Sequence, residues 1–179
     1  MKYNLGGRGK GTDGYIHVNL EDDCDVKHDI LDLDGFIKED GVVEEFFLEH
    51  TLEHVPIPQY KNFLLHMKRK LKKGGKIKVI HTDAGDVLEL WKQGRLPFRS
   101  MKKTLFPPAD YVAWNPLMAH QNMWTPEDLA KDFIALGFEA YTFDAGQWGF
   151  DLTDEFYPGT DEKYWGVPIK NLGVLAVKV

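Results

Sequence analysis

Apolar and polar residues alternate along several short segments of the chain in the way that predicts β-strands. Residues 15–20 contain β-favouring side chains and are followed by an acidic turn at residues 21–23, and residues 76–82 alternate basic and apolar side chains. Residues 42–48 form an apolar segment that ends at the polar cluster 50–54. The segments expected to form strands or short extended elements are 2–5, 15–20, 25–31, 42–48, 76–82, 139–143 and 172–179.

A helix is predicted between residues 61 and 72, because its apolar side chains recur on one face. These side chains are Phe63, Leu64, Met67 and Leu71. Gly74 and Gly75 follow, and we expect them to end the helix by supplying left-handed backbone geometry. A strand, a helix and a second strand form a βαβ unit with a right-handed crossover between parallel strands. The leading fold is therefore α/β, with helices and a parallel sheet in three layers.

A second helix is predicted where a capping sequence precedes an apolar stripe. Thr125 and Pro126 have the residue types of a helix N-terminus with proline in the first turn. The stripe consists of Leu129, Phe133 and Leu136, and Gly137 is expected to stop the helix. Between the two helices, residues 84–123 are rich in proline and aromatic side chains. They predict a less regular segment that covers the active side of the sheet.

Composition favours one domain, residues 1–179, in a reducing compartment. A chain of 179 residues, 43% of them hydrophobic, can bury one substantial core. Cys24 cannot form an internal disulfide, and the N-terminus lacks an apolar secretory signal, so we expect a cytoplasmic protein. No apolar run is long enough to span a bilayer, and a net charge of −6 argues against a broad nucleic-acid surface. The basic residues at 68–70, 72 and 73 are interpreted as a solvated helix face.

A glycine-rich turn, residues 6–11, comes directly after the first predicted strand. Such a turn in a doubly wound sheet permits close approach of a ligand at the carboxyl ends of the strands. A glycine-rich surface turn is the equally weighted alternative. The pattern of a phosphate-binding loop, GxxxxGK[ST], is absent, which disfavours hydrolysis of nucleoside triphosphates.

Several segments taken together carry a more specific resemblance. Their order and spacing are similar to those of the small class I S-adenosylmethionine (SAM)-dependent methyltransferases, type 11-like. The matching segments are NLGG at 4–7, GYIHVNL at 14–20, DVKHD at 25–29, EHTLEH at 49–54, LKKGGKI at 71–77, WTPE at 124–127 and LGF at 136–138. The resemblance implies a Rossmann-like sandwich around a mostly parallel seven-stranded sheet whose last strand is antiparallel.

The resemblance also implies a binding site for SAM and its product S-adenosylhomocysteine. Gly6 and Gly7 would approach the methionine portion, the end of the second strand would meet the ribose, and Asp29 would lie near the adenine. The positions assigned to the cofactor are Asn4, Leu5, Gly6, Gly7, Arg8, Asn19, Leu20, Asp29, Ile30 and His50. Two of them depart from the family pattern: Arg8 replaces a glycine, and Asn19 replaces an acid that accepts both ribose hydroxyls.

Methyl transfer needs mainly an aligned acceptor, because the sulfonium of SAM already activates the methyl group. His50 is the first candidate to accept a proton from a hydroxyl acceptor, and His81 and Asp83 are the second candidates at the same sheet edge. His120 could complete the pocket from the covering segment. A loop-packing or capping role is the alternative for His50. The expected acceptor is an oxygen or nitrogen of a small metabolite or glycan precursor.

Because the chain starts almost at its first strand, we expect it to lack the N-terminal helices that often cover the family's site. A homodimer or the internal aromatic segments would supply that cover.

Two other functions compete with methyl transfer. One is a noncatalytic domain that binds SAM or a protein partner, which the departures at Arg8 and Asn19 make credible. The other is a zinc peptidase, because residues 50–54 match the pattern HxxEH. In such an enzyme two imidazoles on one helix face would bind zinc, with a further protein ligand. The methyltransferase-like context disfavours this, and we expect no metal ligand in the chain.

Overall fold

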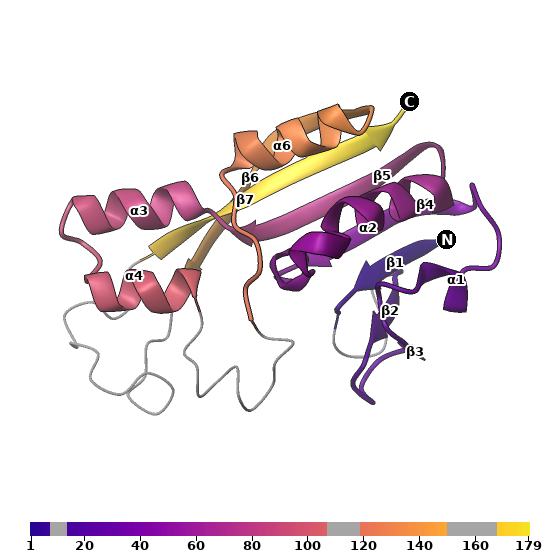
Figure 1. Ribbon diagram of the computed structural model, residues 1–179, viewed down its shortest axis with the longest axis horizontal. Helices are drawn as coiled ribbons and strands as arrows, with labels where there is room; N and C mark the ends of the chain where they lie inside the picture. The colour runs from indigo at the N-terminus through magenta and orange to yellow at the C-terminus, as the bar shows by residue number, and fades with distance from the viewer. Residues whose placement is uncertain (8–13, 107–118, 150–167) are drawn as a thin grey trace.

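The computed structural model describes residues 1–7, 14–106, 119–149 and 168–179, and these residues contain one seven-stranded sheet (Figure 1). The strand order across the sheet is β3-β2-β1-β4-β5-β7-β6. The strands are β1 Lys2–Leu5, β2 Ile16–Asn19, β3 Val26–Lys27, β4 Val43–Glu49, β5 Leu71–Thr82, β6 Phe138–Gly149 and β7 Pro168–Lys178.

The first five strands are parallel, whereas β7 is antiparallel to both of its neighbours. β1 pairs in parallel with β2 and β4, and β4 pairs in parallel with β5. β7 is inserted between β5 and β6 with antiparallel pairing on each side. The predicted α/β architecture, mostly parallel with an antiparallel last strand, is confirmed. The carboxyl ends of β1, β2, β3, β4 and β5 therefore meet at one edge of the sheet, where ligands bind in open α/β folds.

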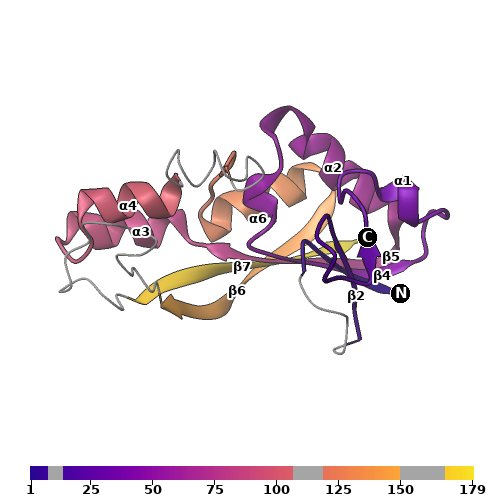
Figure 2. The same ribbon diagram turned by 90° about the horizontal axis from the view of Figure 1, so that it is seen from below.

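The helices lie together on one face of the sheet in the described part of the chain (Figure 2). They are α1 Leu33–Phe36, α2 Ile57–Lys70, α3 Ala84–Lys92, α4 Phe98–Leu105 and α6 Pro126–Ala135, with a short 3-10 turn, η1, at Leu52–His54. Residues 6–15 and 20–25 link β1 to β2 and β2 to β3, and both links are shorter than a usual helical crossover. No helix within the described ranges is long and apolar enough to cross a membrane.

The main core is formed between β4, β5 and the helices that cover them. Phe46 and Leu48 of β4 are completely buried, as are Leu64 and Met67 of α2 and Phe133 of α6. Each side chain of this size contributes roughly 1.5–3 kcal/mol when it is fully buried. The apolar stripes predicted for the two helices are thus the surfaces that attach α2 and α6 to the sheet.

The predicted role of Gly74 and Gly75 as the end of α2 is wrong. The helix ends at Lys70, and Leu71 already has an extended backbone and pairs with Val43 in the sheet. The next paired residue of β5 is Lys76, opposite Glu45, so the intervening residues leave the regular ladder. Gly74 does have a positive φ of 72°, but it lies in the irregular stretch of β5 and not at the end of the helix. The helix ends before the two glycines because Leu71 pairs with Val43 of β4, a residue distant in the sequence.

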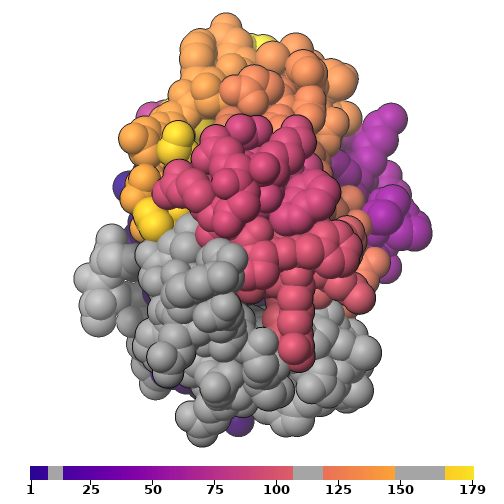
Figure 3. Space-filling view, turned by 90° about the vertical axis from the view of Figure 1, so that its left-hand side faces the viewer, coloured from indigo at the N-terminus to yellow at the C-terminus, as the bar shows by residue number. Residues whose placement is uncertain are grey.

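The predicted covering segment, 84–123, is more regular than its composition indicates. It contains α3 and α4, which share a small second core of Val87, Leu90, Leu96, Met101 and Leu105 with Ile169 of β7. Figure 3 shows that residues of these two helices form one continuous surface at this end of the molecule. Residues 107–118, which include Tyr111 and Trp114, lie outside the described residues.

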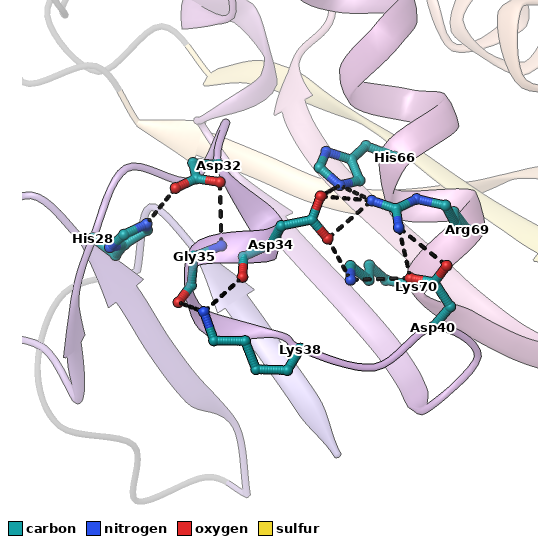
Figure 4. A network of polar contacts seen from close by, with 9 residues as sticks. All are labelled: His28, Asp32, Asp34, Gly35, Lys38, Asp40, His66, Arg69 and Lys70. Carbon is teal, nitrogen blue, oxygen red and sulfur yellow. Dashed lines mark hydrogen bonds and ion pairs between the residues drawn. The ribbon is translucent and has the colours of Figure 1, made fainter.

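The basic residues near the end of α2 do not form a purely solvated face. The Lys70 side chain is completely buried, and its Nζ lies 2.6 Å from Asp34 Oδ1 and 3.0 Å from Asp40 Oδ1. Arg69 bonds to the same two carboxylates from the surface (Figure 4). This charged network joins α1 and the segment before β4 to the last turn of α2, where cations also interact favourably with the helix dipole. It lies near the starts of β4 and β5, at the opposite edge from their carboxyl ends.

Thr125→Ala is expected to lower the free energy of unfolding by about 1 kcal/mol, because it removes the N-cap of α6. The Thr125 Oγ1 accepts a hydrogen bond from the Asp128 backbone N–H at 3.3 Å. Urea denaturation measures the change, and Thr125→Ser, which keeps the hydroxyl, is the control. An equal loss in both variants would assign the effect to the Thr125 methyl group, which faces Gly85.

Candidate functional site

The candidate site lies at the carboxyl ends of β1, β2 and β4, beginning with the turn after β1. Gly6 has a φ of 82°, and its backbone N–H donates to the Val18 carbonyl at 2.8 Å. A Cβ on Gly6 would lie 2.4 Å from Thr51 Oγ1, so the absence of a side chain allows the turn to pack against the end of β4. Thr51 is held in place because its hydroxyl donates to the Glu49 carbonyl at 3.0 Å.

Asn19 connects the end of β2 to this glycine turn. Its side-chain NH₂ donates to the carbonyl of Gly6 at 3.1 Å and to that of Gly7 at 3.4 Å. Its side-chain oxygen accepts from the backbone N–H of Leu20 at 2.7 Å. A carboxylate could not donate to the two carbonyls, which gives a physical reason for an amide at this position. Arg8, the other departure from the family pattern, lies outside the described residues.

The remaining positions assigned to the cofactor surround this turn and the end of β3. Asn4 is buried beside Gly7, and the Leu5 side chain belongs to the core, so only its backbone is available to a ligand. Asp29 is exposed, and one of its carboxylate oxygens accepts from the backbone N–H of Leu31 at 2.9 Å. Ile30 is half-buried against the core. The structure therefore leaves polar backbone at β1 and an exposed carboxylate after β3 on the same sheet edge.

His50 terminates β4 in an unusual backbone conformation. Its φ of 47° is the one positive value among the described residues other than glycine. Its backbone N–H donates to the Ile80 carbonyl at 2.9 Å, which still belongs to the pairing of β4 with β5. Left-handed backbone at a residue with a side chain costs energy and is concentrated at functional sites. The conformation turns the chain from the strand into η1.

A buried carboxylate, Glu53, lies among the histidines at the carboxyl ends of β4 and β5. Its Oε1 is 3.6 Å from His50 Nδ1, 4.0 Å from His54 Nε2 and 3.9 Å from His81 Nδ1. His120 packs against His54 with ring centroids 4.9 Å apart. We call these five residues the Glu53 cluster.

The segment that begins at residue 119 is held against the Glu53 cluster by backbone hydrogen bonds. The backbone N–H groups of Gln121 and Asn122 both donate to the Glu53 carbonyl, at 2.7 and 3.2 Å. The Asn122 side chain donates to the Val55 carbonyl at 2.7 Å. These contacts bring His120 from the predicted covering segment to the end of β4.

The environment of the Glu53 cluster shifts several pKa values. Burial alone would raise the pKa of Glu53, but bonding to His50 and the neighbouring imidazoles outweigh it and lower the pKa to about 2. Burial lowers the pKa of His81 to about 4, and burial also lowers the pKa of His120. At neutral pH the carboxylate is therefore charged, whereas His81 and His120 are neutral.

The structure brings together two of the three predicted catalytic residues. His50 and His81 both lie beside the Glu53 carboxylate, and the centroids of their two rings are 6.5 Å apart. Asp83 instead accepts hydrogen bonds from the backbone N–H groups of Gly85 and Asp86 as the N-cap of α3. The sequence reasoning missed the central position of Glu53, although the HxxEH pattern contained the signal.

The HxxEH segment does not have the helical geometry that a zinc peptidase requires. Glu49 ends β4, and only Leu52–His54 form a short 3-10 turn. His50 and His54 therefore are not presented one turn apart on an α-helix. The pairing of β4 with the sheet determines this geometry, and the peptidase hypothesis loses its structural basis.

No protein-family model and no curated protein matches the sequence. Solved methyltransferases match the structure over nearly the whole chain. A SAM-dependent methyltransferase from Methanosarcina mazei is 14% identical, with a TM-score of 0.58, and the match covers 99% of this chain and 92% of that protein. A SAM-dependent methyltransferase from Archaeoglobus fulgidus is 14% identical, with a TM-score of 0.57 and coverages of 99% and 85%. The chain has the class I methyltransferase fold.

One further neighbour was solved with ligands. The 1,6-didemethyltoxoflavin-N1-methyltransferase of Burkholderia thailandensis, with bound 1,6-didemethyltoxoflavin and S-adenosylhomocysteine, is 14% identical. Its TM-score is 0.56, and the match covers 99% of this chain and 71% of that protein. At this identity the likeness establishes the shared fold, and the activity has to be argued from the site.

Proposed function

We propose that the protein transfers a methyl group from SAM to a small acceptor and releases S-adenosylhomocysteine. The observation that carries this proposal is the glycine turn at the carboxyl end of β1, in a sheet with the strand order and directions of the methyltransferase fold. The methyl group of SAM is already activated by the sulfonium, so this chain has mainly to bind the cofactor and align the acceptor.

The cofactor would bind across the ends of β1, β2 and β3. The backbone of Gly6 and Gly7 would approach the methionine portion, and glycine is needed at both positions because a Cβ would collide with Thr51 or Asn4. Asn19 would reach the ribose from the end of β2 while it holds the turn, and Asp29 would approach the adenine. Asn4, Leu5, Arg8, Leu20 and Ile30 would complete this surface.

The acceptor would lie beside the end of β4, next to the cofactor. Thr51 touches the cofactor turn at Gly6, and the neighbouring His50 is part of the Glu53 cluster. His50 would accept the proton of a hydroxyl or amine acceptor, and Glu53 would act as a positioning residue for its imidazole. We propose an oxygen or nitrogen of a small metabolite or glycan precursor as the methyl acceptor.

Calorimetric titration of the metal-free protein with SAM and S-adenosylhomocysteine tests the proposal. We expect saturable binding of both, and a loss of at least about fivefold in affinity for Asp29→Ala because the adenine contact is removed. Asp22→Ala is the matched control, because Asp22 is 90% exposed and pairs with Lys27.

Absence of binding by folded wild-type protein would overturn the proposal. Saturable binding without methyl transfer to any acceptor in a screen of hydroxyl and amine compounds would favour the noncatalytic SAM-binding alternative. Methyl transfer that is lost in His50→Gln while cofactor affinity is retained would support the role proposed for His50.

A further inference from the structure

In the Glu53 cluster, several buried side-chain nitrogen and oxygen atoms make no hydrogen bond. Glu53 and His81 are both more than nine-tenths buried, with 2% and 3% of their side chains exposed. The second carboxylate oxygen of Glu53 and both ring nitrogens of His81 are buried without a hydrogen-bond partner. Buried polar atoms usually have partners, because leaving them without one costs energy. The unpartnered oxygen of Glu53 indicates a missing ligand at this carboxylate.

Two histidines of the cluster are oriented by carbonyl groups outside it. His54 Nδ1 lies 3.3 Å from the Ala119 carbonyl oxygen, and His120 Nδ1 lies 3.2 Å from the Leu105 carbonyl oxygen. A carbonyl can only accept a hydrogen bond, so each Nδ1 must carry the proton. In a neutral imidazole, Nε2 then keeps its lone pair. Backbone carbonyls fix metal-binding histidines in this way in many proteins.

The donor atoms also have a spacing that a metal ion can use. Glu53, His54 and His120 each offer one ligand atom, and these atoms lie within 4.8 Å of one another. A four-coordinate ion with bonds of about 2.0–2.2 Å requires ligand atoms roughly 3.3–3.6 Å apart. His54 Nε2 and Glu53 Oε1, at 4.0 Å, are already close to that separation. Small side-chain rotations would close the remaining gap.

We propose that Glu53, His54 and His120 bind a divalent transition-metal ion of the zinc type. Two imidazoles and one carboxylate form a donor set that suits Zn²⁺ or Co²⁺, whereas Mg²⁺ and Ca²⁺ prefer oxygen ligands alone. Three protein ligands leave a fourth position for water or for an oxygen of a bound molecule. The site is distinct from the peptidase geometry, since His120 comes from a segment 66 residues beyond His54 in the chain.

A second group, His50, Glu53 and His81, also offers three ligand atoms that lie within 4.8 Å of one another. We assign the ion to the first group because both of its imidazoles have their second nitrogen fixed by a carbonyl. His81 lacks such a partner on either nitrogen. The alternative without a metal is an ordered water that bridges Glu53 and His81.

The test is the affinity of the chelator-stripped protein for Zn²⁺, measured by competition with a chromogenic chelator, together with the visible spectrum of the Co²⁺ form. We expect one ion per chain, and the intense absorption of four-coordinate Co²⁺. His54→Gln, His120→Gln and Glu53→Gln should each weaken Zn²⁺ binding by more than about tenfold. His28→Gln is the matched control, since His28 bonds to Asp32 outside the cluster.

The outcomes distinguish the proposal from its alternatives. Circular dichroism of each metal-free variant verifies folding, and His120→Gln is the most informative variant because His120 is only partly buried. His81→Gln should change Zn²⁺ affinity by less than about threefold. Loss of binding in His81→Gln but not in His120→Gln would overturn the assignment. Absence of stoichiometric binding, or binding that all of these variants retain, would overturn the site itself. None of these measurements depends on methyl transfer.

Discussion

Gly6→Ala is expected to lower the free energy of unfolding by about 2–4 kcal/mol and to weaken S-adenosylhomocysteine binding by at least about tenfold. Two costs add at this position. The backbone has a φ of 82°, which residues with a side chain rarely adopt. The new Cβ would also lie 2.4 Å from Thr51 Oγ1 and 2.7 Å from Thr51 Cγ2, so the turn or the end of β4 must move.

Gly41→Ala separates these two costs. Gly41 has a φ of 72°, and a Cβ there would meet no atom within 4 Å, so only the backbone strain remains. We expect this control to cost about 1 kcal/mol and to leave cofactor affinity unchanged. Gly6→Ala combined with Thr51→Ala should recover part of the stability, because it relieves the collision.

Urea denaturation and calorimetric titration measure both effects. Equal losses of stability in Gly6→Ala and Gly41→Ala would show that contact with Thr51 contributes nothing. Unchanged cofactor affinity in a folded Gly6→Ala variant would argue against placing the methionine portion at this turn.

The double substitution Asp34→Asn with Asp40→Asn is expected to lower the midpoint of thermal unfolding by about 5 °C or more. It leaves the Lys70 ammonium buried without a negative partner, at a position where Nζ now lies 2.6 and 3.0 Å from the two carboxylates. Breaking a buried ion pair on one side is costly because the remaining charge keeps its desolvation penalty. The partial exposure of both carboxylates reduces that cost through access of water.

Lys70→Met tests whether the buried charge causes this loss. Replacement of a buried charge by an apolar side chain of similar volume is often nearly neutral, so we expect a small change in the midpoint. In the Lys70→Met background the two asparagine substitutions should have little further effect. Asp22→Asn, in the exposed pair with Lys27, should leave the midpoint unchanged. A full loss in the Lys70→Met background would contradict the proposed coupling.

The same network predicts a dependence of stability on acid. The Lys70 ammonium, assisted by Arg69, holds the pKa values of Asp34 and Asp40 below their ordinary values. Because these carboxyl groups bind protons more weakly in the folded state, their contribution is present above about pH 4 and is lost as the pH falls further. The free energy of unfolding should therefore fall more steeply below about pH 4 in the wild type than in Lys70→Met.

Most element types and several boundaries follow from short-range patterns in the sequence. The strand at Lys2–Leu5 is confirmed. It could be predicted because its apolar side chains and the glycine that follows are local signals. Thr125 and Pro126 predict the start of α6 for the same reason, and the Thr125 hydroxyl indeed caps the helix. The end of α2 was not predictable, since pairing of Leu71 with Val43 depends on a strand that is distant in sequence.

The sequence by itself determined the α/β architecture, the glycine turn after β1 and the polar residues at the ends of β4 and β5. Hydrophobic periodicity and turn chemistry act over a few residues, so they can be recognised without the rest of the chain. Only the tertiary structure established that Lys70 is buried, that Asn19 holds the glycine turn, and that His120 joins Glu53. Those contacts connect segments far apart in sequence, and their energies depend on burial and distance, which no local pattern contains.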